Sequence, residues 1–422
     1  MHARTARSSV SSFAAAFVLT VSLFALWGLG HRLYDALVMQ FTGVIGLRGF
    51  ELALTRSMYS IVYFLGAIPA ALYACRFGYK AAIVFGLGSI CIGAFLLYPA
   101  AETQAFAYFL LAAAVMSCGW IFLEVAANPL AAALGSVETS VRRLNVAQSF
   151  FPLGALAGVF AGRWMVAAHL ALPAAGFAYS IVHPYIVIGA AVLLLAFRFE
   201  EVRFPPVASE HSRDLKSTAR DFRALLSRPL FVFGIAAQSC SVLALAGTWS
   251  VGGSYFAAAF PGAAPLGGVD IFVWSLAVFA LGRFVGSALM FRFDPDRLLA
   301  VFAGGGLMLA AIAACTGGPL GAVSVIASSF FLSITWPTVL GIAIRGFGPL
   351  MKLGTALVCM GGALGGVAYQ MLNVIWTNPS VRAAMVVPAV SYAVVLAFAV
   401  AHDMIRRTAA APPAAAPGAK AS

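Results

Sequence analysis

The stretch Gly154-Ala155-Leu156-Ala157-Gly158-Val159 returns later in the chain as Gly362-Ala363-Leu364-Gly365-Gly366-Val367. The two stretches are 208 residues apart (362 − 154), and Pro129 recurs as Pro337 at the same offset (337 − 129). Chance explains one short match between helices rich in glycine and alanine, but not a shared offset on separate segments. The repeat predicts two copies of one unit, arranged as parallel halves with a cavity between them at mid-membrane.

The composition of the chain predicts that both copies lie in a membrane. Of 422 residues, 62% are hydrophobic and 9% are charged, with a mean hydropathy of +0.96. The apolar runs are long enough to cross about 30 Å of hydrocarbon. They fall near 13–44, 52–74, 80–99, 104–134, 144–166 and 178–198, and then near 230–256, 268–291, 298–316, 321–345, 353–375 and 381–404. We expect an all-α membrane protein with twelve transmembrane helices in two pseudo-symmetric six-helix bundles.

The runs divide the chain into four expected parts. Residues 1–199 form the N-terminal six-helix bundle, residues 200–228 a cytoplasmic linker, and residues 229–405 the C-terminal six-helix bundle. Residues 406–422 form a tail rich in alanine and proline, which we expect to be disordered in the cytoplasm. Neither the linker nor the tail shows periodic apolar residues suited to docking a partner.

Basic residues predict the orientation. Most of the 26 Lys and Arg residues lie at the N-terminus, in the linker, in the tail, or in the turns that hold Arg76 and Lys80, Arg142 and Arg143, Arg292 and Arg297, and Arg345 and Lys352. The positive-inside rule then places both termini in the cytoplasm, in a bacterial inner membrane. The net charge of +12 does not predict nucleic-acid binding, because these residues are spread over separate turns.

Two carboxylates lie deep inside apolar runs, Asp35 in the first and Glu124 in the fourth. Each costs about 2.5 to 3.5 kcal/mol at the centre of a bilayer, unless it faces water, finds a partner or takes up a proton. A carboxyl group that loses its water holds a proton more firmly, so it can load a proton outside and release it inside. Alternatively, Asp35 pairs locally with Arg32, and Glu124 only anchors helices through hydrogen bonds.

Motifs around these carboxylates resemble the fucose/proton symporter family of the major facilitator superfamily, which also includes glucose/galactose transporters. The first run reads Leu26-Trp27-Gly28 and Asp35-Ala36-Leu37-Val38-Met39-Gln40-Phe41, and the fourth reads Leu123-Glu124-Val125-Ala126-Ala127-Asn128-Pro129. The fifth opens Arg143-Leu144-Asn145-Val146-Ala147-Gln148-Ser149-Phe150. Shorter matches are Ala237-Gln238, Trp249-Ser250, Gly282-Arg283-Phe284 and Trp336-Pro337-Thr338.

The resemblance implies a proton-coupled symporter that imports a monosaccharide or a related sugar by alternating access. In that family the first-helix Asp and the fourth-helix Glu couple proton uptake to sugar binding, which here implies Asp35 and Glu124. No cofactor is expected besides the proton, the coupling ion. The expected partners are the sugar, protons and the lipid bilayer, and we expect a monomer.

Sugar binding needs amides for hydroxyl groups and an aromatic face for the ring. The candidates for these contacts are Gln148, Asn145, Gln238, Phe151, Trp249 and Trp336, with Phe150 and Trp274 as further aromatic candidates. Gln148 is the firmest, because it matches the family motif.

The chain departs from the family's fucose transporter at two positions. Arg32 and Phe151 replace asparagines three residues before the first-helix Asp and three after the fifth-helix Gln. Arg32 either neutralises Asp35, leaving Glu124 as the only proton carrier, or faces the cavity and binds an acidic group. Our hypothesis is a sugar other than fucose, with sugar acids among the candidates.

Two other functions are compatible with the sequence, a proton-driven exporter of an amphipathic small molecule and a sugar receptor that does not transport. The six cysteines occur singly, which predicts neither a disulfide framework nor a metal site. No phosphate-binding loop and no pairing of a nucleophile with a base is found, which argues against ATP-driven transport and against an enzyme.

Overall fold

The computed structural model describes residues 2–171, 183–202, 204, 215–261, 271–376 and 380–410. Regular structure in these ranges is helical. The first half holds α1 (His2–Ile45), α2 (Gly49–Thr103), α3 (Phe106–Ala133), α4 (Ser140–Gln148), α5 (Phe151–Ala171), α6 (His183–Glu201) and α7 (Leu215–Leu226). The second half holds α8 (Pro229–Ala259), α9 (Ile271–Leu289), α10 (Pro295–Thr316), α11 (Gly318–Leu332), α12 (Thr335–Ala343), η4 (Gly348–Leu350), α13 (Met351–Ile375), α14 (Val381–Ala384) and α15 (Val386–Ala410).

The described helices account for twelve spans. Ten segments are long and apolar enough to cross a membrane. One of them, α2, contains two spans joined at Gly78, which has φ 89° and ψ 169° and so interrupts the helix. A positive φ of this size favours glycine, since a Cβ atom makes it costly. With α6 as a further span, the predicted twelve-helix fold is confirmed.

Three of the predicted spans are interrupted in the structure, each four residues before a proline. The α4–α5 break follows Gln148 and precedes Pro152, and the α14–α15 break follows Ala384 and precedes Pro388. The α11–α12 break falls at Ser333, four residues before Pro337. Proline has no N–H for the carbonyl one turn back, and its ring clashes with that carbonyl.

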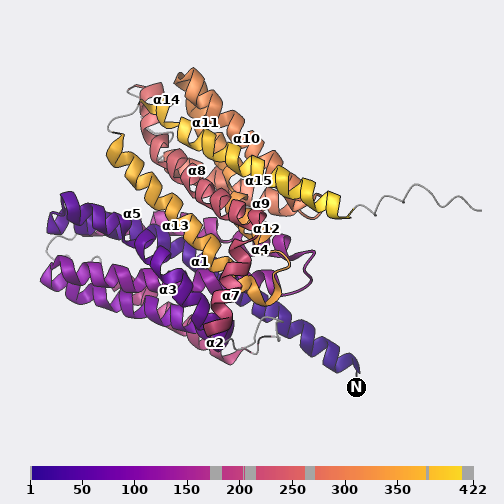
Figure 1. Cartoon of the computed structure of the whole chain (residues 1–422). Coiled ribbons are helices and arrows are strands. Elements are labelled where there is room, and N and C mark those ends of the chain that lie inside the picture. Colours follow the sequence, from indigo (N-terminus) through magenta and orange to yellow (C-terminus); the bar gives the residue numbers. More distant parts are fainter. Residues whose placement is uncertain are drawn as a thin grey trace, which may run out of the picture.

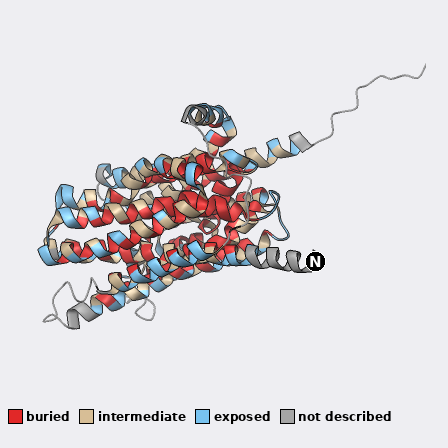
Figure 2. Ribbon diagram, turned by 90° about the horizontal axis from the view of Figure 1, so that it is seen from below, coloured by how far each residue is buried: buried red, intermediate tan, exposed pale blue. Residues whose placement is uncertain are grey.

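The spans form two groups that lie side by side (Figure 1), the N-terminal bundle α1–α6 and the C-terminal bundle α8–α15. The N-terminus and the C-terminal end of α15 lie at the same end of the molecule, which we call the linker end because α7 joins the bundles there. The opposite end is called the far end. Figure 2 shows buried residues concentrated where the helices face one another and exposed residues on the outer faces.

Part of the linker is a helix that the sequence analysis did not anticipate. Leu225 of α7 is fully buried, and Phe222 packs against the same core cluster. The expectation that the linker lacks periodic apolar residues is therefore wrong for this segment. The predicted disordered tail begins at residue 406, but α15 continues to Ala410, so the prediction is wrong for residues 406–410. Residues 203 and 205–214 of the linker and residues 411–422 of the tail lie outside the described residues.

The two bundles are in close contact at the linker end. The Thr338 hydroxyl donates to Asn145 Oδ1 at 3.2 Å, and the hydroxyls of Ser149 and Ser287 lie 2.8 Å apart. Lys352 Nζ of α13 also donates to the Ala74 carbonyl of α2 at 2.9 Å. These contacts close the interface at this end.

At the far end the facing surfaces are open to solvent. The Asp35 side chain is 54% exposed, and Met39 one turn further along α1 is 62% exposed. Two pockets lie between the bundles here, one reaching Gln370 of α13 and one reaching Phe272 of α9. The structure is therefore closed at the linker end and open at the far end.

Candidate functional site

A cavity of about 170 Å³ lies between the two bundles. The N-terminal bundle lines it with Trp27, His31, Arg32, Tyr59, Ser60, Tyr63, Glu124, Gln148 and Phe151. The C-terminal bundle lines it with Ser241, Val242, Leu245, Trp249, Phe279, Arg283, Leu332, Thr335, Trp336, Cys359, Gly362, Ala363 and Gly366. Because both bundles contribute, any relative movement of the bundles changes the cavity.

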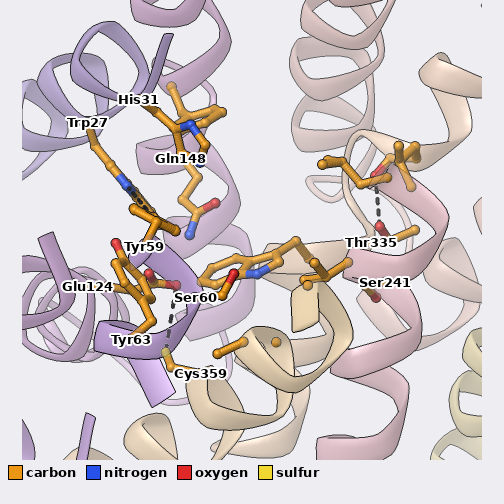
Figure 3. A pocket seen from close by; sticks show the side chains of 18 of the residues that line it. Trp27, His31, Tyr59, Ser60, Tyr63, Glu124, Gln148, Ser241, Thr335 and Cys359 are labelled. Carbon is orange, nitrogen blue, oxygen red and sulfur yellow. Dashed lines mark hydrogen bonds between the residues drawn. The ribbon is translucent and has the colours of Figure 1, made fainter. Parts of the chain in front are cut away.

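Glu124 of α3 is the only carboxylate among the described residues that line this cavity. It is 5% exposed and forms no ion pair with any described residue. Its Oε1 accepts a long hydrogen bond of 3.7 Å from Cys359 Sγ, which belongs to the other bundle. The rings of Tyr59 and Tyr63, stacked with centroids 4.1 Å apart, lie beside it (Figure 3). Glu124 is therefore a buried acid without a cation.

Gln148 connects the bundles through both ends of its amide. Its Nε2 donates to Asn128 Oδ1 at 2.6 Å within the N-terminal bundle. Its Oε1 accepts from Arg283 Nη1 of α9 at 3.0 Å. Because α4 ends at Gln148, the side chain lies where the fifth span is interrupted, next to the Ser149–Ser287 contact.

Aromatic rings form two walls of the cavity. Trp27 of α1 packs edge-on against Phe151 and Trp336, with ring centroids 5.4 and 6.0 Å away. Trp249 packs edge-on against Phe279 at 5.2 Å, and its Nε1 donates to Ser329 Oγ at 3.3 Å. Three aromatic residues named from the sequence, Phe151, Trp249 and Trp336, thus line the cavity.

Arg32 lies at the boundary between the cavity and a far-end pocket, because it lines both. Arg32 Nη1 bonds Asp35 Oδ2 at 2.9 Å, within α1. Arg32 lines the cavity and is 13% exposed, whereas Asp35 lines the far-end pockets. The two roles considered for Arg32, as the partner of Asp35 and as a cation facing the cavity, therefore occur together.

Comparison with known proteins identifies the family. No protein-family model matches the chain. The chain is 31% identical over 409 residues to the L-fucose-proton symporter of Escherichia coli (strain K12), a match that covers 92% of this chain and 93% of that protein. The chain belongs to the fucose/proton symporter family.

Two further comparisons agree with this assignment. The glucose/galactose transporter of Brucella abortus is 28% identical over 400 residues, which cover 92% of this chain and 94% of that protein. A solved structure described as a major facilitator superfamily transporter, FucP, in the outward conformation matches with a TM-score of 0.82 and 30% identity, covering 93% of this chain and 99% of the other. The predicted family and fold are confirmed, and this member of the fucose/proton symporter family is a multi-pass membrane transporter, not an enzyme.

Two amides proposed from the sequence do not line the cavity of this family member. Asn145 is fully buried, and its side chain bonds the Val141 carbonyl and Thr338 in the linker-end contact. Gln238 is fully buried in α8, and its amide atoms have no hydrogen-bond partner among the described residues. Their predicted contacts with substrate stay predictions. Trp274 and Phe150, the further aromatic candidates, are 44% and 36% exposed and also lie outside the cavity lining.

Several residues that line the cavity were not predicted from the sequence as site residues. Tyr59 and Tyr63 are four residues apart, so they share one face of α2. This spacing predicts that the two rings lie together, but not that they line the cavity. Arg283 is a charge inside an apolar run, the same signal that identified Asp35 and Glu124, but the sequence analysis used it only as part of a motif. Cys359, one of the six single cysteines, contacts Glu124 from the other bundle.

Proposed function

We propose that the protein is a proton-coupled symporter that imports a monosaccharide or a related sugar by alternating access. The observation that carries this proposal is Glu124, a buried carboxylate that forms no ion pair with a described residue, in a cavity that both bundles line. The names of the relatives, an L-fucose-proton symporter and a glucose/galactose transporter, support sugar as the substrate class.

Glu124 is the proton carrier in this proposal. An ionised carboxylate that is buried without a cation is costly, and taking up a proton removes that cost. Asp35, the other carrier suggested by the sequence, already has a cation partner in Arg32 at 2.9 Å and lies in water. We therefore assign one proton to each transport cycle, carried by Glu124.

The cavity lining supports a sugar as the substrate. Aromatic faces such as those of Trp27 and Trp336 can cover the apolar C–H surface of a sugar ring. Hydroxyl and amide groups near them, on Ser60 and Gln148, can bind sugar hydroxyls. The lining combines both types of surface, as recognition of a small polar ring requires.

The distribution of charge supports a cytoplasmic linker end. Among the described residues, the turns and helix ends there carry many basic side chains, namely Arg76, Lys80, Arg142, Arg143, Arg198, Arg292, Arg297, Arg345, Lys352, Arg406 and Arg407. The described part of the far end carries Arg48, Arg56, Arg163 and Arg382. By the positive-inside rule, the closed linker end faces the cytoplasm of a bacterial inner membrane, and the structure is the outward-open state of the cycle.

The test is uptake of labelled sugars, neutral and acidic, into proteoliposomes whose outside is more acidic than the inside, with and without an uncoupler. Symport predicts accumulation of a sugar above its outside concentration, abolished by the uncoupler. If no sugar is taken up under either direction of the gradient, symport is contradicted. Export of an amphipathic molecule then becomes the preferred function. Binding without uptake would indicate a receptor.

A further inference from the structure

The charged side chains that line the cavity do not balance. In the described lining, two are arginines, Arg32 and Arg283, and one is a carboxylate, Glu124. Asp35 lies outside the cavity and is 54% exposed, but it pairs with Arg32 at 2.9 Å, which leaves Arg283 and Glu124 as the other charges of the lining. Once Glu124 takes up a proton, Arg283 remains as a positive charge, and the cavity then attracts an anion.

Arg32 is held in place, but not all of its N–H donors have a hydrogen-bond partner among the described residues. Its guanidinium carbon lies 5.4 Å from the ring centroid of Trp249 and 5.2 Å from that of Phe272. One edge bonds Asp35, and the buried Nε has no hydrogen-bond partner among the described residues. A guanidinium group has five N–H donors in a fixed plane, which matches the two oxygens of a carboxylate. Arg32 therefore keeps a donor available at the edge of the cavity.

Arg283 is the more deeply buried cation. It is 3% exposed, its Nη1 donates to the neutral amide of Gln148 at 3.0 Å, and its Nε has no partner within the described chain. No ion pair joins it to a described carboxylate. Its guanidinium carbon lies 5.0 Å from the ring centroid of Phe279.

The two guanidinium groups share one aromatic wall. Arg32 lies over Trp249, Trp249 packs on Phe279 at 5.2 Å, and Phe279 lies against Arg283. Rings stabilise cations at their faces but cannot neutralise them. A buried charge without a counter-ion is costly, so an anion from outside would stabilise this site.

We propose that the substrate carries one carboxylate, so that it is a sugar acid, and that this carboxylate binds Arg283 and Arg32. The inference rests on the proposed symport and names the substrate class of the same cavity. When Glu124 holds its proton and Arg32 pairs with Asp35, one uncompensated charge remains, that of Arg283. A monoanion neutralises it, whereas the doubly charged phosphate of a sugar phosphate leaves the cavity negative.

The charges that enter in each cycle determine whether transport depends on the membrane potential. One proton and one monoanion enter together, so the cycle moves no net charge. A neutral sugar that enters with one proton moves one positive charge, and a membrane potential of 100 mV then changes the accumulation ratio about fiftyfold. Dependence on membrane potential thus separates the two substrate classes.

The experiment uses D-galacturonate and D-galactose, a pair that differs in having a carboxylate or a hydroxymethyl group on the same ring. Proteoliposomes of the unmodified protein receive either a pH gradient or a potential set by potassium and valinomycin. We expect the pH gradient to accumulate galacturonate, and the potential to change that accumulation less than twofold. We expect galactose to be taken up at least about tenfold more slowly, because it lacks the charged hydrogen bonds.

Variants locate the effect. Arg32→Gln and Arg283→Gln are expected to reduce the preference for galacturonate over galactose at least about tenfold. Arg56→Gln is the matched control, because Arg56 is an exposed arginine of the far end that does not line the cavity. It should leave the preference unchanged. The dependence on membrane potential is measured on the unmodified protein, so this part of the test does not depend on whether the variants fold.

Each outcome has a distinct meaning. Proton-driven accumulation of galactose without galacturonate overturns the inference and leaves symport intact. Galacturonate uptake that responds fiftyfold to potential overturns the charge count on which the inference rests. If neither these two sugars nor any other neutral or acidic sugar accumulates under a pH gradient, the proposed symport itself fails.

Discussion

Replacing Glu124 with glutamine should separate exchange of substrate from its accumulation. The substitution keeps the shape of the side chain and removes the site that takes up the proton. In the structure, Glu124 makes no ion pair with a described residue, and its side chain accepts a long contact from Cys359 at 3.7 Å. No buried cation is left alone by the change, so we expect the free energy of unfolding to fall by less than about 1 kcal/mol.

The size of the effect follows from the number of carriers. Among the described residues lining the cavity there is one carboxylate, which on the proposed coupling through Glu124 corresponds to one proton per cycle. A pH difference of one unit supplies about 1.4 kcal/mol for each proton, which is a tenfold accumulation of substrate when the membrane potential is zero. Glu124→Gln should reduce the accumulation ratio from about ten to one. Exchange of labelled for unlabelled substrate, which needs no net proton movement, should continue.

The assay measures both quantities on the same proteoliposomes, with potassium and valinomycin clamping the potential at zero. Glu51→Gln is the matched control, because it neutralises an exposed acid in the first turn of α2, away from the cavity. A tenfold accumulation that persists in Glu124→Gln would refute the assignment of the proton to this residue. Loss of exchange together with accumulation would show that Glu124 is needed to bind the substrate itself.

Three further predictions follow from the same contacts. Asp35→Asn should keep the accumulation ratio of the unmodified protein, because Asp35 is already paired with Arg32 at 2.9 Å; a ratio of one would make Asp35 a proton carrier. Gly341→Val should open the linker end, because a Cβ atom at Gly341 already meets Val141 of the other bundle at 3.2 Å, and overpacking costs about 1 to 3 kcal/mol. Faster maleimide labelling, from the linker side, of a cysteine placed at Thr338 in a cysteine-free background would report this opening, and an unchanged rate would contradict it. Asp296→Asn should lower the thermal unfolding temperature, because Asp296 is fully buried and bonds Arg345 and Arg406 at 3.1 Å, and breaking such a network costs about 3 to 5 kcal/mol. An unfolding temperature unchanged in detergent would show that the network is not needed for stability.

The spans could be predicted from the sequence because hydrocarbon thickness sets the length of an apolar run. Their interruptions depend on a more local rule, since the breaks at Gln148, Ser333 and Ala384 each precede a proline by four residues. Proline position alone does not predict a break, because α3 continues through Pro129. Whether neighbouring helices and polar groups compensate for the lost hydrogen bond depends on packing, which the sequence does not reveal.

The sequence identified site residues whose charge is costly inside an apolar run. It could not identify residues whose role depends on the direction in which a helix face points. Glu124 is recognisable in the sequence as a charge inside an apolar run, and the structure places it at the cavity. Asn145 and Gln148 share one short helix and are both buried, yet Gln148 faces the cavity and Asn145 faces Thr338. Gln148 bonds Arg283 of α9, whereas Asn145 bonds Thr338 of α12.

The position of Gln148 suggests how an acidic substrate could drive the transport cycle. A ligand shifts a conformational equilibrium only through different affinities for the two states. In the structure, which is closed at the linker end, Arg283 donates to Gln148 across the bundles, beside the Ser149–Ser287 contact. On the proposed mode of binding, the substrate's carboxylate competes with Gln148 for Arg283, because a charged acceptor forms the stronger hydrogen bond. Binding then weakens one of the contacts between the bundles at the closed end, which favours opening toward the cytoplasm once both the acid and the proton are in the cavity.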